Sequence, residues 1–210
     1  MSSSLIVCNN NEPFLNQIVT CDELWILYNN WQWPAQWLDQ EEAPKHFQKP
    51  NLHPKKVMVT VLLSAAGLIC YTFLNPGETL TTEKNVQPVN EIHRKLQHLQ
   101  PVLVNRKGST LLHDNAWPHI TQQTLQNFNK LGYKFLPHPP HSPDLLPTGY
   151  YFYKNLDNFL QGKYFHEQQE AEDAFQEFLK SWSKDFCNTR ISKLISQWQN
   201  CVNCNGSYFD

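Results

Sequence analysis

The sequence predicts a single α/β domain with a central mixed sheet flanked by helices, and three observations favour this class. Its 210 residues suit one domain with one substantial hydrophobic core. The first part of the chain carries short runs rich in β-branched and aromatic residues, separated by turn residues. The remainder alternates short strand-like runs with longer segments whose apolar residues recur with the period of a helix.

Composition favours an ordered protein without strong overall charge. Aromatic residues make up 13% of the chain and charged residues only 17%, which is low for a globular protein. The formal net charge is −2, so nucleic-acid binding would have to come from local basic patches. The sequence has no signal peptide and no apolar run of about 18 residues. Its six cysteines are therefore expected to stay reduced in an intracellular protein that is neither secreted nor bound to a membrane.

The N-terminal part is expected to form an antiparallel meander. Residues 1–17 contain an asparagine-rich run before a proline, and we interpret them as a linker remnant without secondary structure. β-branched and aromatic runs predict the strands that follow, and the Pro76-Gly77 pair ends this unit. The expected strands are residues 18–28, 33–38, 57–64 and 68–74.

Helices and strands are expected to alternate after the meander. A first helix is expected to begin near Pro88, because a proline is tolerated in the first turn of a helix, and to end near residue 99. Gly132 is expected to end a helix over residues 120–131. The remaining expected elements are strands 111–113 and 133–136, and helices from Thr148 to about 160, 168–182 and 189–199.

Two carboxylates fall at positions that suggest chemistry. Asp22 lies inside the first apolar strand, where an acid is either paired or functional, and Asp114 ends the strand 111–113. A meander followed by alternating helices and strands, with acids on the first strand, on a later strand and at the start of a following helix, is the ribonuclease-H-like arrangement. Such an acid cluster holds two Mg²⁺ ions about 3.5–4 Å apart, which activate the attacking oxygen and stabilise the leaving oxygen.

Four sequence segments resemble mariner-type transposases, and the resemblance covers essentially the whole chain. It is closest to the transposase part of a primate protein in which this domain is fused to a SET methyltransferase domain. The 34 residues between Asp114 and Gly149 match the acid spacing of the family. The four segments are TCDELW (20–25), HDNAWPH (113–119), HSPDLLPTGY (141–150) and WQNCVNCNGSYF (198–209).

The resemblance implies a site that has lost part of its metal-binding set. Asp22 and Asp114 match the first two metal-binding acids of the family, which implies Mg²⁺ or Mn²⁺ as the cofactor. The third acid position is Gly149, which has no side chain to offer a metal, so metal binding is expected to be weakened or lost. Trp117 also replaces an arginine of the family motif. Asp157 lies eight residues beyond Gly149 and is not expected to substitute for the missing acid.

The resemblance also implies the domain organisation and the partners. Residues 18–210 are expected to be the catalytic domain, without the family's N-terminal helix-turn-helix units and without a SET domain or methyltransferase residues. The expected function is that of a transposase relic with impaired strand transfer and weak, non-specific DNA contact, nuclear if directed to DNA and cytoplasmic otherwise. The alternatives are a non-catalytic module that dimerises or docks on a partner, and a reading frame that yields no stable protein.

Two further patterns leave open alternatives. Four lysines could contact the DNA backbone, although a solvated face is at least as consistent with the neighbouring Glu41 and Glu42. Cys201 and Cys204 have the spacing of a zinc ligand pair, but no second pair or suitably spaced histidine completes a site. The lysines are Lys45, Lys49, Lys55 and Lys56.

Overall fold

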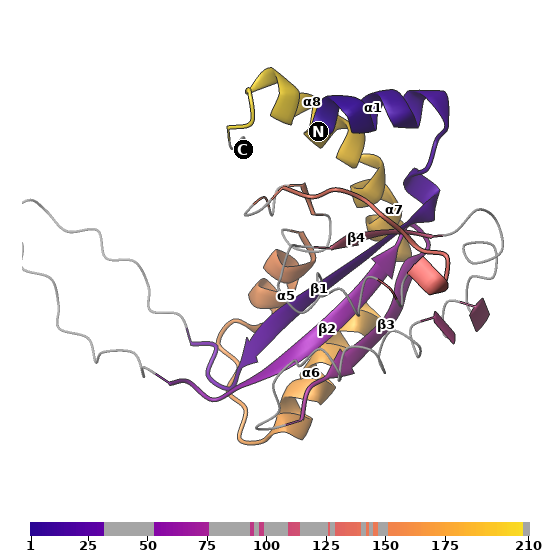
Figure 1. Cartoon of the computed structure of the whole chain (residues 1–210). Coiled ribbons are helices and arrows are strands. Elements are labelled where there is room, and N and C mark those ends of the chain that lie inside the picture. The colour runs from indigo at the N-terminus through magenta and orange to yellow at the C-terminus, as the bar shows by residue number, and fades with distance from the viewer. Residues whose placement is uncertain are drawn as a thin grey trace, which may run out of the picture.

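A computed structural model shows a mixed sheet with helices packed on it and a helical pair at one end (Figure 1). The structure describes residues 1–31, 53–75, 93–94, 97–98, 109–113, 126, 129–139, 142, 145–146 and 151–207. The strands are β1 (Ile18–Leu27), β2 (Lys56–Ser64), β3 (Gly67–Phe73), β4 (Thr110–His113) and β5 (Lys134–Phe135). The helices are α1 (Ser2–Asn11), the 3-10 turn Leu15–Gln17, α5 (Tyr153–Leu160), α6 (Gln168–Ser181), α7 (Lys184–Ser192) and α8 (Leu194–Asn203).

The sheet has the order β3-β2-β1-β4-β5, with β1 in the centre. β1 pairs antiparallel with β2, and β2 pairs antiparallel with β3. On its other edge β1 pairs parallel with β4, which pairs parallel with β5. The predicted mixed sheet is therefore confirmed. The strand expected over residues 33–38 lies outside the described residues, as do most of the helices expected over 88–99 and 120–131.

Side chains alternate between the two faces of β1, which gives each face its own core. Ile26 joins one cluster together with side chains of α5 and α6. Val19 and Cys21 join a second cluster on the other face, together with Leu62 and Tyr133. The Tyr133 hydroxyl is hydrogen-bonded to Nδ1 of His93 at 3.2 Å. The apolar run that predicted the strand thus reflects burial on both faces.

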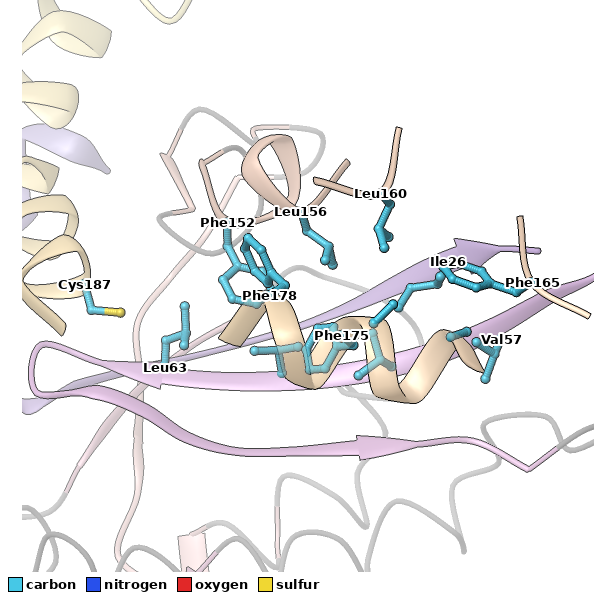
Figure 2. Close-up of a cluster of buried hydrophobic side chains, with 14 residues drawn as sticks. Ile26, Val57, Leu63, Phe152, Leu156, Leu160, Phe165, Phe175, Phe178 and Cys187 are labelled. Atoms are coloured by element: carbon cyan, nitrogen blue, oxygen red, sulfur yellow. The ribbon is translucent and has the colours of Figure 1, made fainter. Parts of the chain in front are cut away.

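Helix α6 covers the first of these faces with an apolar stripe (Figure 2). Phe175 is fully buried and lies edge-on to Tyr71 and Phe73 of β3, with ring centroids 5.2 Å and 5.4 Å apart. Edge-to-face contacts of this kind add stability beyond the burial of apolar area. Phe152 also packs on the stripe, with its ring 5.5 Å from that of Phe178. The predicted apolar face of α6 is confirmed, and its buried members are Ala171, Ala174, Phe175 and Phe178.

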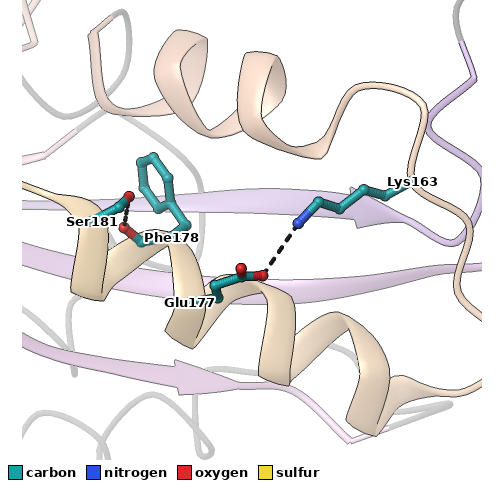
Figure 3. Close-up of polar contacts among 4 residues, drawn as sticks. All are labelled: Lys163, Glu177, Phe178 and Ser181. Carbon is teal, nitrogen blue, oxygen red and sulfur yellow. Dashed lines mark hydrogen bonds and ion pairs between the residues drawn. The ribbon is translucent and has the colours of Figure 1, made fainter.

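Polar contacts on α6 are peripheral to this packing (Figure 3). Lys163 Nζ lies 3.4 Å from a carboxylate oxygen of Glu177, whose side chain is 70% exposed. The Ser181 hydroxyl donates a 2.7 Å hydrogen bond to the carbonyl oxygen of Phe178 at the end of the helix. Because an exposed ion pair contributes at most about 1 kcal/mol, burial of the apolar stripe is what holds α6 on the sheet.

The N-terminal segment differs from its prediction. The expectation that residues 1–17 have no secondary structure is wrong, because they form α1 and a 3-10 turn. In Figure 1, α1 lies beside α8 at the top of the view, and the two helices are in contact. Leu5 is buried in a cluster with Leu194 and Trp198 of α8. The ring of Phe14 stacks on that of Trp198 at 6.1 Å. These contacts come from the far end of the chain, which explains why local composition did not reveal them.

The C-terminal helix also differs from its prediction. Residues 189–199 do not form one helix, because the chain is divided at Lys193 into α7 and α8. Ser183 caps α7 by accepting a hydrogen bond from the backbone N–H of Asp185. Cys187 packs into the core beneath α6, whereas Trp198 packs with α1. The break lets each helix bury its side chains in a different cluster.

We predict that α1 contributes to the stability of the domain. Replacing Leu5, which is 7% exposed, with alanine should lower the free energy of unfolding by about 2–3 kcal/mol because it leaves a cavity against α8. Val7→Ala in the same helix is the matched control. Val7 is 57% exposed, so its replacement should change stability by no more than about 0.5 kcal/mol. Urea unfolding followed by circular dichroism measures both, and equal effects would contradict the packing of α1.

Candidate active site

Asp22 lies on the central strand, between the antiparallel and parallel halves of the sheet. It pairs with Val61 of β2, and the preceding residue, Cys21, pairs with His113 of β4. By the alternation of β1, its side chain lies on the same face as Leu24 and Ile26, the face that α5 and α6 cover. A half-buried carboxylate is therefore held on a rigid element beside the helical layer.

The orientation of this carboxylate is fixed locally. Oδ1 of Asp22 accepts a 2.9 Å hydrogen bond from the backbone N–H of Glu23. A carboxylate oxygen is a ligand that Mg²⁺ and Mn²⁺ accept, so Asp22 fits the role of one metal ligand. In the part of the chain that the structure describes, no group of three or more His, Cys, Asp or Glu side chains is arranged to hold a metal ion.

The parallel pairing of β1 with β4 ends just before the predicted acids. Its last pair is Cys21 with His113, and each of these residues is followed in the sequence by a predicted metal ligand, Asp22 and Asp114. Asp114, Gly149 and Trp117 lie outside the described residues. The structure therefore places one of the predicted site residues and the strand that leads to the second.

Helix α5 follows the predicted third acid position. The described chain resumes at Tyr151, two residues after Gly149, with a π turn over residues 151–152 before α5 begins at Tyr153. Thr148, the predicted helix cap, lies outside the described residues. Asp157 is on α5, and partial burial raises the pKa of its carboxyl. Leu156 and Leu160 of the same helix are buried in the core, which fixes α5 against the sheet.

Sequence reasoning missed Arg190, a residue of α7 that contacts the segment just before α5. Arg190 of α7 places its guanidinium carbon 3.6 Å from the ring centroid of Tyr151 and 5.0 Å from that of Phe186. The Phe186 contact follows from the i, i+4 spacing on one helix. The Tyr151 contact joins residues 39 positions apart in the chain, so no local sequence pattern predicts it.

The structure describes two of the four lysines and both cysteines whose roles the sequence left open. Lys56 Nζ sits 4.0 Å from the ring centroid of Trp25, and Lys45 and Lys49 lie outside the described residues. Cys201 and Cys204 are at the end of α8, where the backbone N–H of Gly206 bonds the carbonyl oxygen of Cys201 at 2.8 Å. The cysteine pair is thus part of a helix C-terminus closed by left-handed residues.

Comparisons with known proteins match this arrangement. Residues 27–106 match the family model described as transposase (partial DDE domain). The chain is 69% identical over 210 residues to histone-lysine N-methyltransferase SETMAR of Homo sapiens, covering all of this chain and 31% of that protein. It is 29% identical over 200 residues to the mariner Mos1 transposase of Drosophila mauritiana, covering 95% of this chain and 58% of that protein. The chain therefore spans a third to somewhat over half of the length of these relatives.

Solved structures of Mos1 are similar over the entire chain. A pre-cleavage Mos1 transpososome aligns with a TM-score of 0.90 and 28% identity, covering 100% of this chain and 61% of that one. Mos1 paired-end complexes with Mn and with Mg align with TM-scores of 0.89 and 0.88 at 29% identity, with the same coverage of each chain. These neighbours agree with the ribonuclease-H-like topology of the sheet.

The sheet order and the similarity to the Mos1 catalytic domain define a ribonuclease-H-like fold. Over its whole length the chain is similar to part of SETMAR, and over nearly all of it to the mariner Mos1 transposase. In the described part of the chain, no helix is long and apolar enough to cross a membrane.

We predict that the cysteines differ sharply in reactivity. Burial raises the pKa of the Cys187 thiol from 9.0 to about 11, so near pH 8 it carries far less reactive thiolate than an unperturbed thiol. Cys8 and Cys204 are exposed. A thiol reagent at pH 8 should therefore modify them at least about tenfold faster than Cys187. Peptide mapping by mass spectrometry measures the rates, and the denatured chain is the control. Equal rates in the folded protein would refute the burial of Cys187.

Proposed function

We propose that this chain is a transposase-derived domain that binds DNA but is impaired in metal-dependent strand transfer. The observation that carries the proposal is the parallel register of β1 and β4, which ends at Cys21 and His113. Neighbouring parallel strands lie about 4.8 Å apart. We therefore propose that Asp22 and Asp114, which follow this pair in the sequence, share a metal ion. We propose residues 18–210 as the catalytic unit, with residues 1–17 leading into it.

The proposed impairment lies in the third ligand. Mos1 has been solved in complexes with Mn and with Mg, and we propose that Asp22 and Asp114 would bind such an ion here. Gly149 supplies no ligand atom, so one of two metal positions would be weakened. A catalytic metal contributes several kcal/mol to transition-state stabilisation, and each 1.36 kcal/mol is a factor of ten in rate. Strand transfer should therefore fall by orders of magnitude.

The proposed DNA contact is weak and without sequence preference. Mos1 has been solved as a transpososome and as a paired-end complex with the left transposon end. In the present chain Lys55 and Lys56 are exposed at the start of β2 and offer positive charge to a phosphate backbone. The formal net charge of −2 argues that such contact is local and sensitive to salt. A nuclear location would follow from this activity.

We predict that restoring the third acid restores nicking. The full chain should nick supercoiled plasmid poorly in Mn²⁺, and Gly149→Asp should increase the rate by more than about tenfold because it completes the ligand set. Conversion of supercoiled to open-circular plasmid, followed on agarose gels over time, measures the rate.

Two controls separate metal chemistry from a change in folding. Gly149→Ala adds a side chain without a ligand and should give no gain, whereas Asp22→Ala in the Gly149→Asp background should remove the gain. If the unmodified chain nicks efficiently and Asp22→Ala abolishes it, the proposed impairment is wrong. If Gly149→Asp nicks plasmid no faster than Gly149→Ala, the impairment does not come from position 149.

A second candidate function is a non-catalytic module that dimerises. Exposed aromatic side chains near the end of β1 favour it: Trp25 is 44% exposed, and Trp31 and Tyr164 are each more than 60% exposed. The chain near Trp31 is bonded to the loop that carries Tyr164, because the Asn30 N–H donates to the carbonyl of Lys163 at 3.0 Å. Large exposed aromatic side chains are frequent at protein interfaces.

If the chain dimerises through these aromatic side chains, replacing them should change its molar mass in solution. Light scattering at two concentrations should then give a dimer for the unmodified chain and a monomer for the double variant Trp31→Ser/Tyr164→Ser. Both substitutions are at exposed positions, so the core around the fully buried Phe175 is not disturbed. A monomer at both concentrations for the unmodified chain would remove the dimer hypothesis.

A further inference from the structure

Arg190 is held in an unusual environment for a cation. Its guanidinium lies against the ring of Tyr151 at 3.6 Å and against that of Phe186 at 5.0 Å. An aromatic face attracts a cation, and a guanidinium stacks on it more readily than an ammonium group does. Phe186 in turn packs on Trp182, whose ring lies 4.3 Å from that of Phe152 in the core. The guanidinium is therefore held by rings that are themselves fixed by packing.

The hydrogen-bonding capacity of this side chain is incompletely used. Nε of Arg190 is buried and has no hydrogen-bond acceptor within reach in the structure as described. Among the described residues no carboxylate forms an ion pair with Arg190. A buried donor on a charged group is costly when it lacks a partner. The buried Nε cannot reach a ligand, but an anion bound at the outer edge of the guanidinium would stabilise the partly desolvated positive charge.

Two exposed lysines lie near Arg190 or near its contact Tyr151 in the sequence. Lys193 is three residues further along the chain and exposed, so it lies on the same side of the helix as Arg190. Lys154 is three residues beyond Tyr151 on α5 and is also exposed. The acid on α7, Asp185, lies at the opposite end of that helix, where its N–H is bonded to Ser183. Helix α5 also carries Asp157, three residues beyond Lys154, so of these three cations Arg190 and Lys193 are the ones that have no acid close to them in the sequence.

We propose that Arg190 binds a backbone phosphate of DNA beside the start of α5, with Lys154 and Lys193 adding to the positive field. This inference rests on the proposed DNA-binding function and deepens it, because it names the residue that contacts the DNA backbone. A guanidinium matches phosphate geometry through two parallel N–H bonds. Stacking on Tyr151 pre-orients the guanidinium and so reduces the entropy lost on binding.

The test is DNA affinity as a function of salt, measured with the full chain. Fluorescence anisotropy with a labelled duplex should show that Arg190→Gln binds about tenfold more weakly and that its salt slope falls by about one. Arg190→Lys should keep the salt slope but bind more weakly than the unmodified chain, because it keeps the charge and loses the planar fork. Lys180→Gln, on the exposed surface of α6, removes one charge elsewhere and should leave affinity and slope nearly unchanged. Thermal unfolding of each variant checks that the fold is retained.

The outcomes distinguish this inference from the function on which it rests. If the unmodified chain binds DNA and Arg190→Gln matches Lys180→Gln in affinity and slope, Arg190 holds no phosphate and the inference fails alone. If the unmodified chain shows no binding even at low salt, the proposed DNA-binding function fails as well. If Arg190→Gln unfolds, Arg190→Lys decides, and an affinity equal to that of the unmodified chain overturns the inference. Inorganic phosphate at constant ionic strength should not displace the duplex, and Arg190-dependent displacement would assign the site to a free anion instead.

Discussion

The pairing of β1 on both edges is the constraint on which the site depends. β2 holds one edge in an antiparallel register and β4 holds the other in a parallel register. A slip of one residue in either pairing would move Asp22 to the opposite face of the sheet. It would also expose Ile26, which is buried against the helical layer. The burial of the strand therefore fixes the position of the carboxylate, and the stability of the core and the geometry of the site have the same origin.

The helical layer extends this constraint to the start of α5. Phe175 and Phe178 anchor α6 on the sheet, and Phe152 ties α5 to the same cluster. From this cluster the contacts pass through Trp182 and Phe186 to Arg190, and from there back to Tyr151. The segment that follows Gly149 is thus fixed by packing even though position 149 itself has no side chain.

The strands of the meander could be predicted because their signal is local. β1, β2 and β3 are each rich in β-branched, aromatic and other apolar residues, and their predicted bounds differ from the observed ones by a residue or so. The apolar stripe of α6 could also be predicted, because its apolar residues recur with the period of a helix. Helix α1 was not, because Leu5 is buried only through α8. The division between α7 and α8 was missed for the same reason, since Cys187 and Trp198 pack into different clusters.

The sequence by itself determined the fold class, the strand that carries Asp22, and the spacing from Asp114 to Gly149. These properties follow directly from the identity of the residues and from their periodicity along the chain. Only the tertiary structure decided that the two ends of the chain pack together as α1 and α8, and that Arg190 lies against Tyr151. Both contacts join residues far apart in the chain, and their stability comes from surfaces that exist only once the sheet and helices have assembled.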